Sequence, residues 1–343
     1  ANMLSQGKGV PIDYDLATKY FKMAIDKGYA RAINDYGYMI DNMEDVPSNY
    51  GSSIDYFKLA IEYGDADAYV NLSSKYMKGE GVQINHNIGV KYAKLAMKKG
   101  SPEAFFNYAY MLRNGEGVPV NYEEAIKYLQ IAIDKGSSYA MLLYAIMLEK
   151  GEGVPPNKEE SHKYYKMAIN KGNVNAMLYY GSKIKSETGN KDQYLKYLRM
   201  AIDHGSADAM NMYALNIEKE KETSDYMTLA AKYYKMSAEK GYVAGMCNYG
   251  RLLIDGLGVP INIEEGLKLT KKCIDRGCPT AMNNYATILF DGKGGVPVNV
   301  DEAIKYLRMA IDGGCPEALS NYGFMLLHGN KIPVDIKQGA KYI

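Results

Sequence analysis

The sequence contains no tryptophan, only four histidines and only four cysteines among its 343 residues. Since metal sites and nucleophilic sites draw mainly on clustered histidine and cysteine, this scarcity argues against both kinds of chemistry. The 41 lysines and arginines are balanced by 40 aspartates and glutamates, so a broadly basic surface that binds nucleic acid is not expected. No apolar run approaches the roughly 18 residues of a membrane-spanning helix, so membrane insertion is not expected either.

What the sequence does contain is a repeat of about 36 residues. A glycine returns in steps of 36 residues, with one step of 33 and one of 37, at Gly28, Gly64, Gly100, Gly136, Gly172, Gly205, Gly241, Gly277 and Gly314. A small residue follows each of these glycines by four positions, and a tyrosine follows by eight in all but one repeat. Three patterns that share one period indicate a helix-pair solenoid, whose repeats have about this length.

Each repeat predicts two helices. In the first, apolar residues recur at i, i+3, i+4 and i+7 from Ala125, and Asn121 with Glu124 forms a capping-box-like start. Gly136 ends this helix, since glycine adopts the left-handed C′ conformation readily. The second helix ends in a Gly-x-Gly-Val-Pro turn, as at 115–119. The tyrosines on the first helix lie on its apolar face, which favours core packing over base stacking.

The pattern predicts eighteen helices and no sheet. Their expected ranges are 13–27, 30–42, 50–63, 66–78, 86–99, 102–114, 122–135, 138–150, 158–171, 174–185, 191–204, 207–221, 225–240, 243–255, 263–276, 280–291, 300–313 and 316–328.

The repeat resembles the Sel1-like repeat family, a relative of the tetratricopeptide repeats. The resemblance rests on the segment 17–24, on the Gly28, Ala32 and Tyr36 spacing and on the Gly-x-Gly-Val-Pro turn, and it covers essentially the whole chain. It implies an all-α fold, namely a right-handed superhelical solenoid of about nine antiparallel helix pairs. We expect one continuous solenoid over 1–343.

Both ends of the sequence fall inside a repeat. Residues 1–4 align with the middle of a second helix, and 337–343 align with part of a first helix. Because solenoids end in capping repeats with a polar outer face, we expect a segment of a longer protein. Changes of superhelical pitch are expected near 186–193, where the turn lacks three residues, and near 218–225, where a charged segment replaces the turn.

No catalytic, cofactor-binding or metal-binding residue is predicted. His86, His162, His204 and His328 are far apart, and Cys278 and Cys315 occupy the same slot in successive repeats, before proline. The glycine-rich turns lack the preceding strand and the following Lys-Ser/Thr of a phosphate-binding loop. Because some bacterial relatives have been discussed as β-lactam hydrolases, a hydrolase is a remote alternative, although their paired cysteines are missing here.

The cysteines also bear on location. Cys247, Cys273, Cys278 and Cys315 all lie in the last third of the chain, whereas a disulfide-stapled repeat array should carry a pair in each repeat. This distribution favours a reducing compartment, so we expect a cytoplasmic protein. Association with the cytoskeleton or a cilium is one form of this expectation, and the lumen of the secretory pathway is the alternative.

Two basic slots, three residues apart, recur on the first helices opposite the apolar face. We predict that the second slot binds a partner; it holds Lys22, Lys58, Lys94, Lys166, Arg199, Lys235, Lys271 and Arg308. In the related families the first helices line the concave side, so the resemblance implies a rail there for acidic surfaces or peptides. A solvated face is the alternative, since an acidic residue four positions later, such as Asp203, can pair with the slot.

The expected function is therefore that of a non-enzymatic scaffold or adaptor that binds other proteins and needs no cofactor. It could serve as an architectural component of a large cytoskeletal or ciliary assembly. The alternative is a regulatory repeat region of a larger signalling protein such as a kinase.

Overall fold

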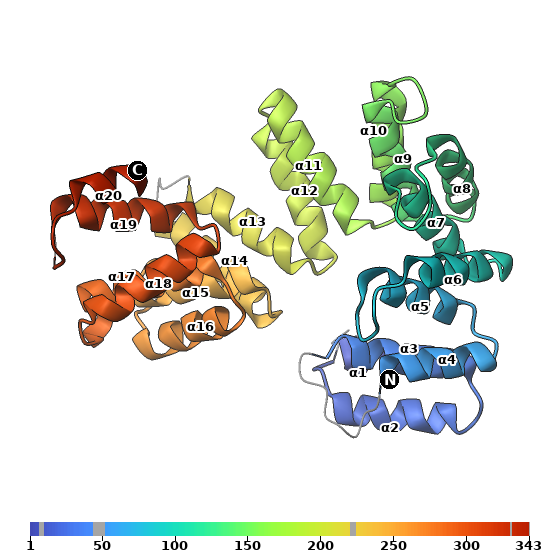
Figure 1. Cartoon of the computed structure of the whole chain (residues 1–343), viewed down its shortest axis with the longest axis horizontal. Coiled ribbons are helices and arrows are strands. Elements are labelled where there is room, and N and C mark those ends of the chain that lie inside the picture. Colours follow the sequence, from blue (N-terminus) through green and yellow to red (C-terminus); the bar gives the residue numbers. More distant parts are fainter. Residues whose placement is uncertain (7–9, 44–51, 220–223, 330, 343) are drawn as a thin grey trace. The chain divides into compact units, whose positions relative to one another are not determined.

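The computed structural model describes residues 1–6, 10–43, 52–219, 224–329 and 331–342. In these ranges the chain forms twenty α-helices, one short 3-10 turn and no strand, which confirms the predicted all-α fold (Figure 1). The helices are α1 (Asn2–Gln6), α2 (Tyr14–Ile25), α3 (Ala30–Asp41), α4 (Ser53–Glu62), α5 (Asp67–Lys78), α6 (His86–Lys98), α7 (Pro102–Asn114), α8 (Tyr122–Asp134), α9 (Ser138–Lys150), α10 (Lys158–Asn170), α11 (Val174–Thr188), α12 (Lys191–Asp203), α13 (Ala207–Glu218), α14 (Ser224–Glu239), α15 (Val243–Asp255), α16 (Ile263–Asp275), α17 (Pro279–Asp291), α18 (Val300–Asp312), α19 (Pro316–His328) and α20 (Ile336–Tyr342).

The eighteen predicted helices correspond to α2 through α19. We call the even-numbered helices from α2 to α18 the first helices, and the odd-numbered helices from α3 to α19 the second helices. The largest differences at helix ends are three residues: α11 continues past the predicted end at 185, and α13 ends before the predicted end at 221. Parts of three predicted features lie outside the described residues: the start of the helix at 50–63, the turn at 7–11 and the irregular segment at 218–225.

The first helices begin at the predicted asparagine caps. The Asn121 side-chain oxygen accepts a hydrogen bond from the Glu124 backbone N–H at 3.0 Å, and Asn157 caps α10 through Glu160 in the same way. Each cap satisfies an N–H group that has no partner inside the helix. The Glu124 carboxylate accepts from the side-chain amide of Asn121 at 3.4 Å, rather than from its backbone as in a full capping box.

The turns that end the second helices pack on the preceding first helix. Gly151 closes α9 in the left-handed conformation, at φ 72°, and Gly153 follows at φ 75°. A Cβ atom on Gly153 would lie 2.5 Å from the Cβ of Tyr122, at the start of α8. The second glycine of this turn is therefore required both by its backbone angle and by close packing.

Alanines and tyrosines fill the space between the helices. Ala125 on α8 and Ala140 on α9 are fully buried, which lets the two helices approach closely. The ring of Tyr144 meets that of Tyr164 on the next first helix edge to face, with centroids 4.8 Å apart. Similar pairs join Tyr36 to Tyr56, Tyr108 to Tyr128, Tyr180 to Tyr197, Tyr213 to Tyr233 and Tyr285 to Tyr306. The tyrosine ladder thus joins successive repeats through their core.

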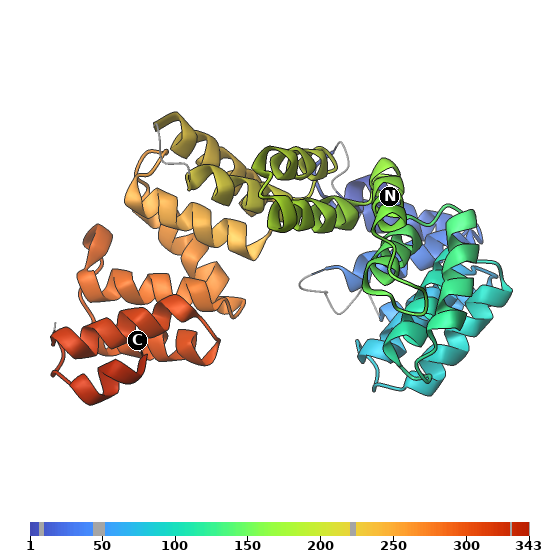
Figure 2. The ribbon, with the colours of Figure 1, turned by 90° about the horizontal axis from the view of Figure 1, so that it is seen from above.

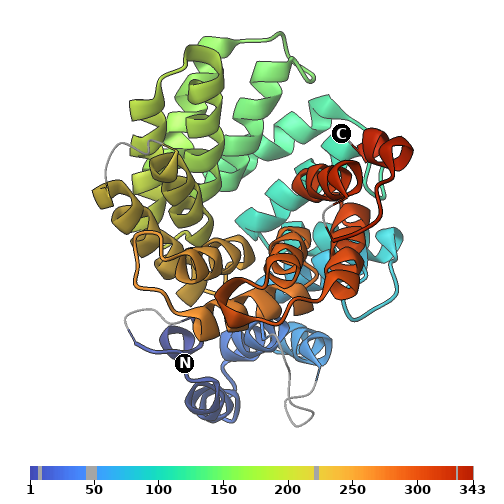
Figure 3. The same cartoon turned by 90° about the vertical axis from the view of Figure 1, so that its left-hand side faces the viewer.

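The chain divides into two compact units, 1–176 and 177–343. Within each unit the helix pairs follow one another along the chain (Figures 2 and 3). In the first unit, α3 packs on α5, α5 on α7 and α7 on α9; in the second, α13, α15, α17 and α19 pack in the same order. Successive first helices approach one another much less, so each unit bends toward its second helices, which form its inner layer.

Candidate binding surfaces

All eight side chains predicted to bind a partner are exposed. They lie on the first helices, facing away from the buried alanine and tyrosine residues. Because the second helices form the inner layer of each unit, the eight cations lie on the outer layer instead of the concave side that the resemblance implies. The physical reason is that the second helices of successive repeats pack on one another, which leaves the first helices on the outside.

Half of these cations contact a tyrosine fourteen residues later, on the second helix of the same pair. The distances to the ring centroid are 5.3 Å for Lys94 over Tyr108, 5.4 Å for Arg199 over Tyr213, 6.0 Å for Lys271 over Tyr285 and 5.7 Å for Arg308 over Tyr322. A cation above an aromatic face is attracted by the ring quadrupole. This part of the basic slot therefore has an internal role, which the sequence analysis did not identify.

The two arginines also bond to the tyrosine hydroxyl. Arg199 Nε donates to the Tyr213 oxygen at 2.9 Å, and Arg308 Nη2 donates to the Tyr322 oxygen at 3.1 Å. Each hydrogen bond raises the pKa of its guanidinium group. In the sequence, each residue of the second basic slot precedes the tyrosine of the following second helix by fourteen positions in nearly every repeat. This constant spacing was the available signal for these pairs.

Acidic neighbours pair with the basic slots at a few positions. Lys235 lies 3.9 Å from Glu239, as the four-residue spacing predicts, and Lys268 in the other slot lies 3.6 Å from Glu265. These pairs are largely exposed, so each contributes little to stability.

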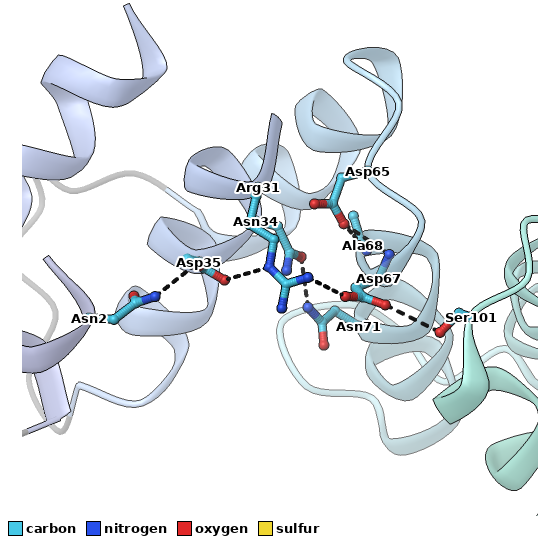
Figure 4. A network of polar contacts seen from close by, with 9 residues as sticks. All are labelled: Asn2, Arg31, Asn34, Asp35, Asp65, Asp67, Ala68, Asn71 and Ser101. Atoms are coloured by element: carbon cyan, nitrogen blue, oxygen red, sulfur yellow. Dashed lines mark hydrogen bonds and ion pairs between the residues drawn. The ribbon is translucent and has the colours of Figure 1, made fainter. Parts of the chain in front are cut away.

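The second helices carry a second polar surface, made of contacts that run from repeat to repeat. In the first unit, Arg31 on α3 reaches Asp67 on α5 at 3.0 Å, and Asp67 accepts a hydrogen bond from Ser101 at the start of α7 at 3.2 Å (Figure 4). On the other side of Arg31, Asp35 accepts from Asn2 at 2.9 Å. The alternate helices α1, α3, α5 and α7 are thus linked through side chains.

An asparagine pair recurs within this surface. The Asn71 amide donates to Asn34 at 2.8 Å (Figure 4), and the same contact joins Asn248 to Asn211 and Asn321 to Asn283. Each pair links second helices of successive repeats. The sequence analysis missed these residues, although their spacing of 37 or 38 positions follows the period.

Two hollows open along the second helices. In the second unit, a groove of about 340 Å³ is lined mainly by polar side chains, including Arg251, Asn283, Asn284, Thr287, Lys293 and Asn321. In the first unit, a hollow of about 580 Å³ contains Lys75, whose side chain is only 7% exposed. Lys75 bonds to Asp41 and, at 2.8 Å, to Glu80, so its buried charge is compensated.

The histidines lie apart: three are on the helices α6, α10 and α19, and His204 is the C-cap residue of α12. His86, His204 and His328 are exposed, and His162 is half-buried. Across the described ranges, no three side chains of His, Cys, Asp or Glu converge in a way that could hold a metal ion. The cysteines differ from expectation, because Cys247, Cys273 and Cys278 gather in one cluster between α15, α16 and α17.

The model of the family described as Sel1 repeat matches most of the chain. The matched repeats are 1–29, 30–65, 66–101, 102–137, 138–173, 207–242, 243–278, 279–315 and 316–343. They begin at the helices called second here, for example 66–101 at the start of α5. The helix that comes first in the matched repeat is thus the one that forms the inner layer.

Solved structures show the same fold. A protective antigen of uropathogenic Escherichia coli, described as displaying an SLR fold, has a TM-score of 0.57 at 24% identity, over 99% of this chain and 73% of its own. A Sel1 repeat protein from Oxalobacter formigenes has a TM-score of 0.54 at 22% identity, over 71% of this chain and 96% of its own. An immunity protein from Pseudomonas aeruginosa has a TM-score of 0.51 at 18% identity, over 63% and 83%.

No curated protein matches the chain. Among the described helices, none combines the length and the apolar character needed to cross a membrane.

Proposed function

The chain belongs to the Sel1 repeat family, and from this premise we propose that it is a non-enzymatic scaffold or adaptor that binds other proteins. Proteins of this family generally mediate protein–protein interactions. The helix pairs present long exposed faces on which the same side chains recur, and asparagine pairs among them join successive repeats. A repetitive surface of this kind suits an extended partner better than a small-molecule substrate.

The partner that we propose is an acidic protein surface or peptide, bound along the first helices. The observation behind this proposal is the exposure of all eight side chains of the basic slot. Within the described residues, Lys22, Lys58 and Lys166 make no ring contact, and Lys235 has only its exposed pair with Glu239, so their ammonium groups can reach a partner. Charge complementarity of this kind acts mainly on the association rate.

The test compares two triple charge reversals of equal net charge. One changes Lys58, Lys166 and Lys235 to Glu on the first helices; the control changes Lys78, Lys150 and Lys219 to Glu at the ends of second helices. Partners are isolated from the source cell with the unaltered chain, identified by mass spectrometry, and then used for binding kinetics with each variant.

We expect the first-helix variant to bind at least ~10-fold more weakly, mainly through slower association, and the control to bind normally. Both variants should show the helical content of the unaltered chain, because all six side chains are exposed. If the control loses the partner while the first-helix variant keeps it, the binding surface lies on the second helices.

We propose an architectural role in a large assembly, such as a cytoskeletal or ciliary complex in the cytoplasm, as the more specific form of this function. A regulatory region of a larger signalling protein, such as a kinase, is the alternative. Isolated partners distinguish the two, since structural subunits favour the first and signalling proteins the second. A hydrolase has the least support, because the four histidines lie on or at the end of four separate helices.

A further inference from the structure

Three cysteines in the second unit lie close together although the sequence separates them. Cys247 is on α15, Cys273 is on α16, and Cys278 is the N-cap residue of α17. Cys247 and Cys273 are buried in one cluster, and Cys278 packs against it while staying partly exposed. All three are free thiols, and the Cys247 sulfur accepts a hydrogen bond from the side-chain amide of Asn284 at 3.6 Å.

The three thiols are not equivalent. The neighbouring Cys247 thiol, together with the backbone N–H groups of Ala281 and Thr280 at the start of α17, lowers the pKa of Cys278 to about 6. The neighbouring Cys278, together with burial, raises the pKa of Cys247. Cys273 donates to the Val243 carbonyl at 3.5 Å, and burial raises the pKa of Cys273 to about 11. A partly exposed cysteine of lowered pKa thus packs against the cluster that holds the buried Cys247, which is the arrangement of an attacking and a resolving cysteine.

We propose that Cys278 and Cys247 form a peroxide-reactive thiol pair that closes into a disulfide between successive repeats. The Cys278 thiolate attacks one oxygen of hydrogen peroxide, the O–O bond breaks, and sulfenic acid forms with release of hydroxide, which takes up a proton to give water. The Cys247 sulfur then attacks the Cys278 sulfur, the S–O bond breaks, and a second water leaves. Two thiols and one peroxide give one disulfide and two waters.

Cys315 is a matched control within the same chain. It is the N-cap residue of α19, also before a proline, and so occupies in the next repeat the place of Cys278. Its sulfur donates to the Glu317 carboxylate at 3.3 Å, and burial together with this bond raises the pKa of the Cys315 thiol. The place of Cys247 is taken in that repeat by Asn283, so Cys315 has no resolving thiol on the preceding second helix.

The test treats the reduced full-length chain with hydrogen peroxide, counts the remaining thiols with a maleimide, and maps the linked peptides by mass spectrometry without reduction. We expect two of the four thiols to disappear and the Cys247 and Cys278 peptides to be joined. C278S should keep all of its remaining thiols, and C247S should accumulate a dimedone-reactive sulfenic acid at Cys278. C273S and C315S should form the disulfide as the unaltered chain does.

A second measurement does not depend on substitution. In the unaltered chain, a limiting amount of iodoacetamide should alkylate Cys278 at least ~10-fold faster than Cys315, because thiolates react and thiols do not. Oxidation should also move the thermal unfolding of the unaltered chain to higher temperature, and this shift should be absent in C278S. Equal alkylation of Cys278 and Cys315, or a disulfide that joins Cys273 instead of Cys247, would overturn the proposal.

Discussion

At the residue scale, the side chains that look most available for a partner divide into two groups. Lys94, Arg199, Lys271 and Arg308 lie over tyrosine rings of their own helix pair, whereas the remaining cations of the slot extend without such a contact in the described ranges. The first group joins the two helices of a pair at the surface. The basic slot thus combines internal contacts with a surface charge for binding.

This division predicts a stability difference between two cations on α12. Arg199→Ala removes the ring contact and the 2.9 Å hydrogen bond to Tyr213, so we expect a loss of about 1 kcal/mol in the free energy of unfolding. Lys196→Ala, one turn earlier and exposed, should change it by less than about 0.5 kcal/mol. Urea denaturation followed by circular dichroism measures both. Equal values would show that the Tyr213 contact does not stabilise the fold.

The contact between the buried Lys75 and Glu80 predicts that the free energy of unfolding depends on pH. The hydrogen bond from Lys75 lowers the pKa of Glu80 below the ordinary value of 4.5. This contact therefore stabilises the fold above pH 4.5, and the stabilisation is lost as the pH falls through the lowered pKa. Glu80→Gln should therefore cost up to about 1 kcal/mol at pH 7, because Glu80 is about half exposed, and nothing once Glu80 is protonated.

Glu116→Gln provides the control for this prediction. Glu116 takes the same place in the next glycine turn but contacts the neutral amide of Asn114, at 3.2 Å. Chemical denaturation of the two variants and the unaltered chain between pH 3 and 7 tests the idea. A Glu80 effect that stays constant over this range would contradict it.

At the scale of the element, the glycine turns do more than end helices. Gly136 and Gly153 both have positive φ angles, 86° and 75°, but a Cβ on Gly136 meets nothing within 4 Å, whereas one on Gly153 meets Tyr122 at 2.5 Å. The turn at Gly136 needs only the left-handed backbone conformation. The turn at Gly153 also needs the absence of a side chain, because it packs on the start of α8.

Two alanine substitutions separate these requirements. Gly136→Ala should lower the free energy of unfolding by about 1 kcal/mol, the usual cost of a left-handed alanine. Gly153→Ala should add an overpacking cost of about 1–3 kcal/mol, because α8 must shift to admit the methyl group. Thermal and urea unfolding measure the difference. If both variants lose the same amount, the turn yields to the methyl group and does not fix the spacing of the repeats.

The sequence predicted best what is decided within one helix or turn. The Asn121 cap and the Gly136 stop depend on residues a few positions apart, and the structure confirms both. The contact of Arg199 with Tyr213 and that of Cys247 with Cys278 depend on how helices pack across 14 and 31 positions. Periodicity shows that such residues recur but does not show which of them meet. The same limit applies to the prediction that the first helices line the concave side, because the inner layer depends on distances between helices of different repeats.

At the scale of the whole molecule, stability should be distributed over the helix pairs. Within each unit the helix pairs pack on their neighbours in the chain, so the free energy of unfolding is expected to be a sum of pair and interface contributions. One continuous solenoid over 1–343 stays a prediction, as do the changes of pitch near 186–193 and 218–225. The two compact units are the observation that bears on them.

Deletion of residues 1–46 tests this distribution. We expect the remaining chain to keep its helical content per residue and to unfold at a somewhat lower urea concentration, since one interface is lost and the others persist. Circular dichroism and urea titration of the shortened and full-length chains give the comparison. Loss of helical structure throughout the shortened chain would show that the repeats fold only as a single cooperative body.

The polar contacts between second helices join residues that lie about one repeat apart in sequence, as Arg31 joins Asp67 and Asn283 joins Asn321. During synthesis, a repeat therefore acquires its neighbours as soon as the next 36 or so residues have left the ribosome, long before the chain is complete. Topology of this kind, with a low contact order, gives rapid folding. Folding can thus keep pace with translation, and an unfinished chain exposes the apolar face of only its newest repeat.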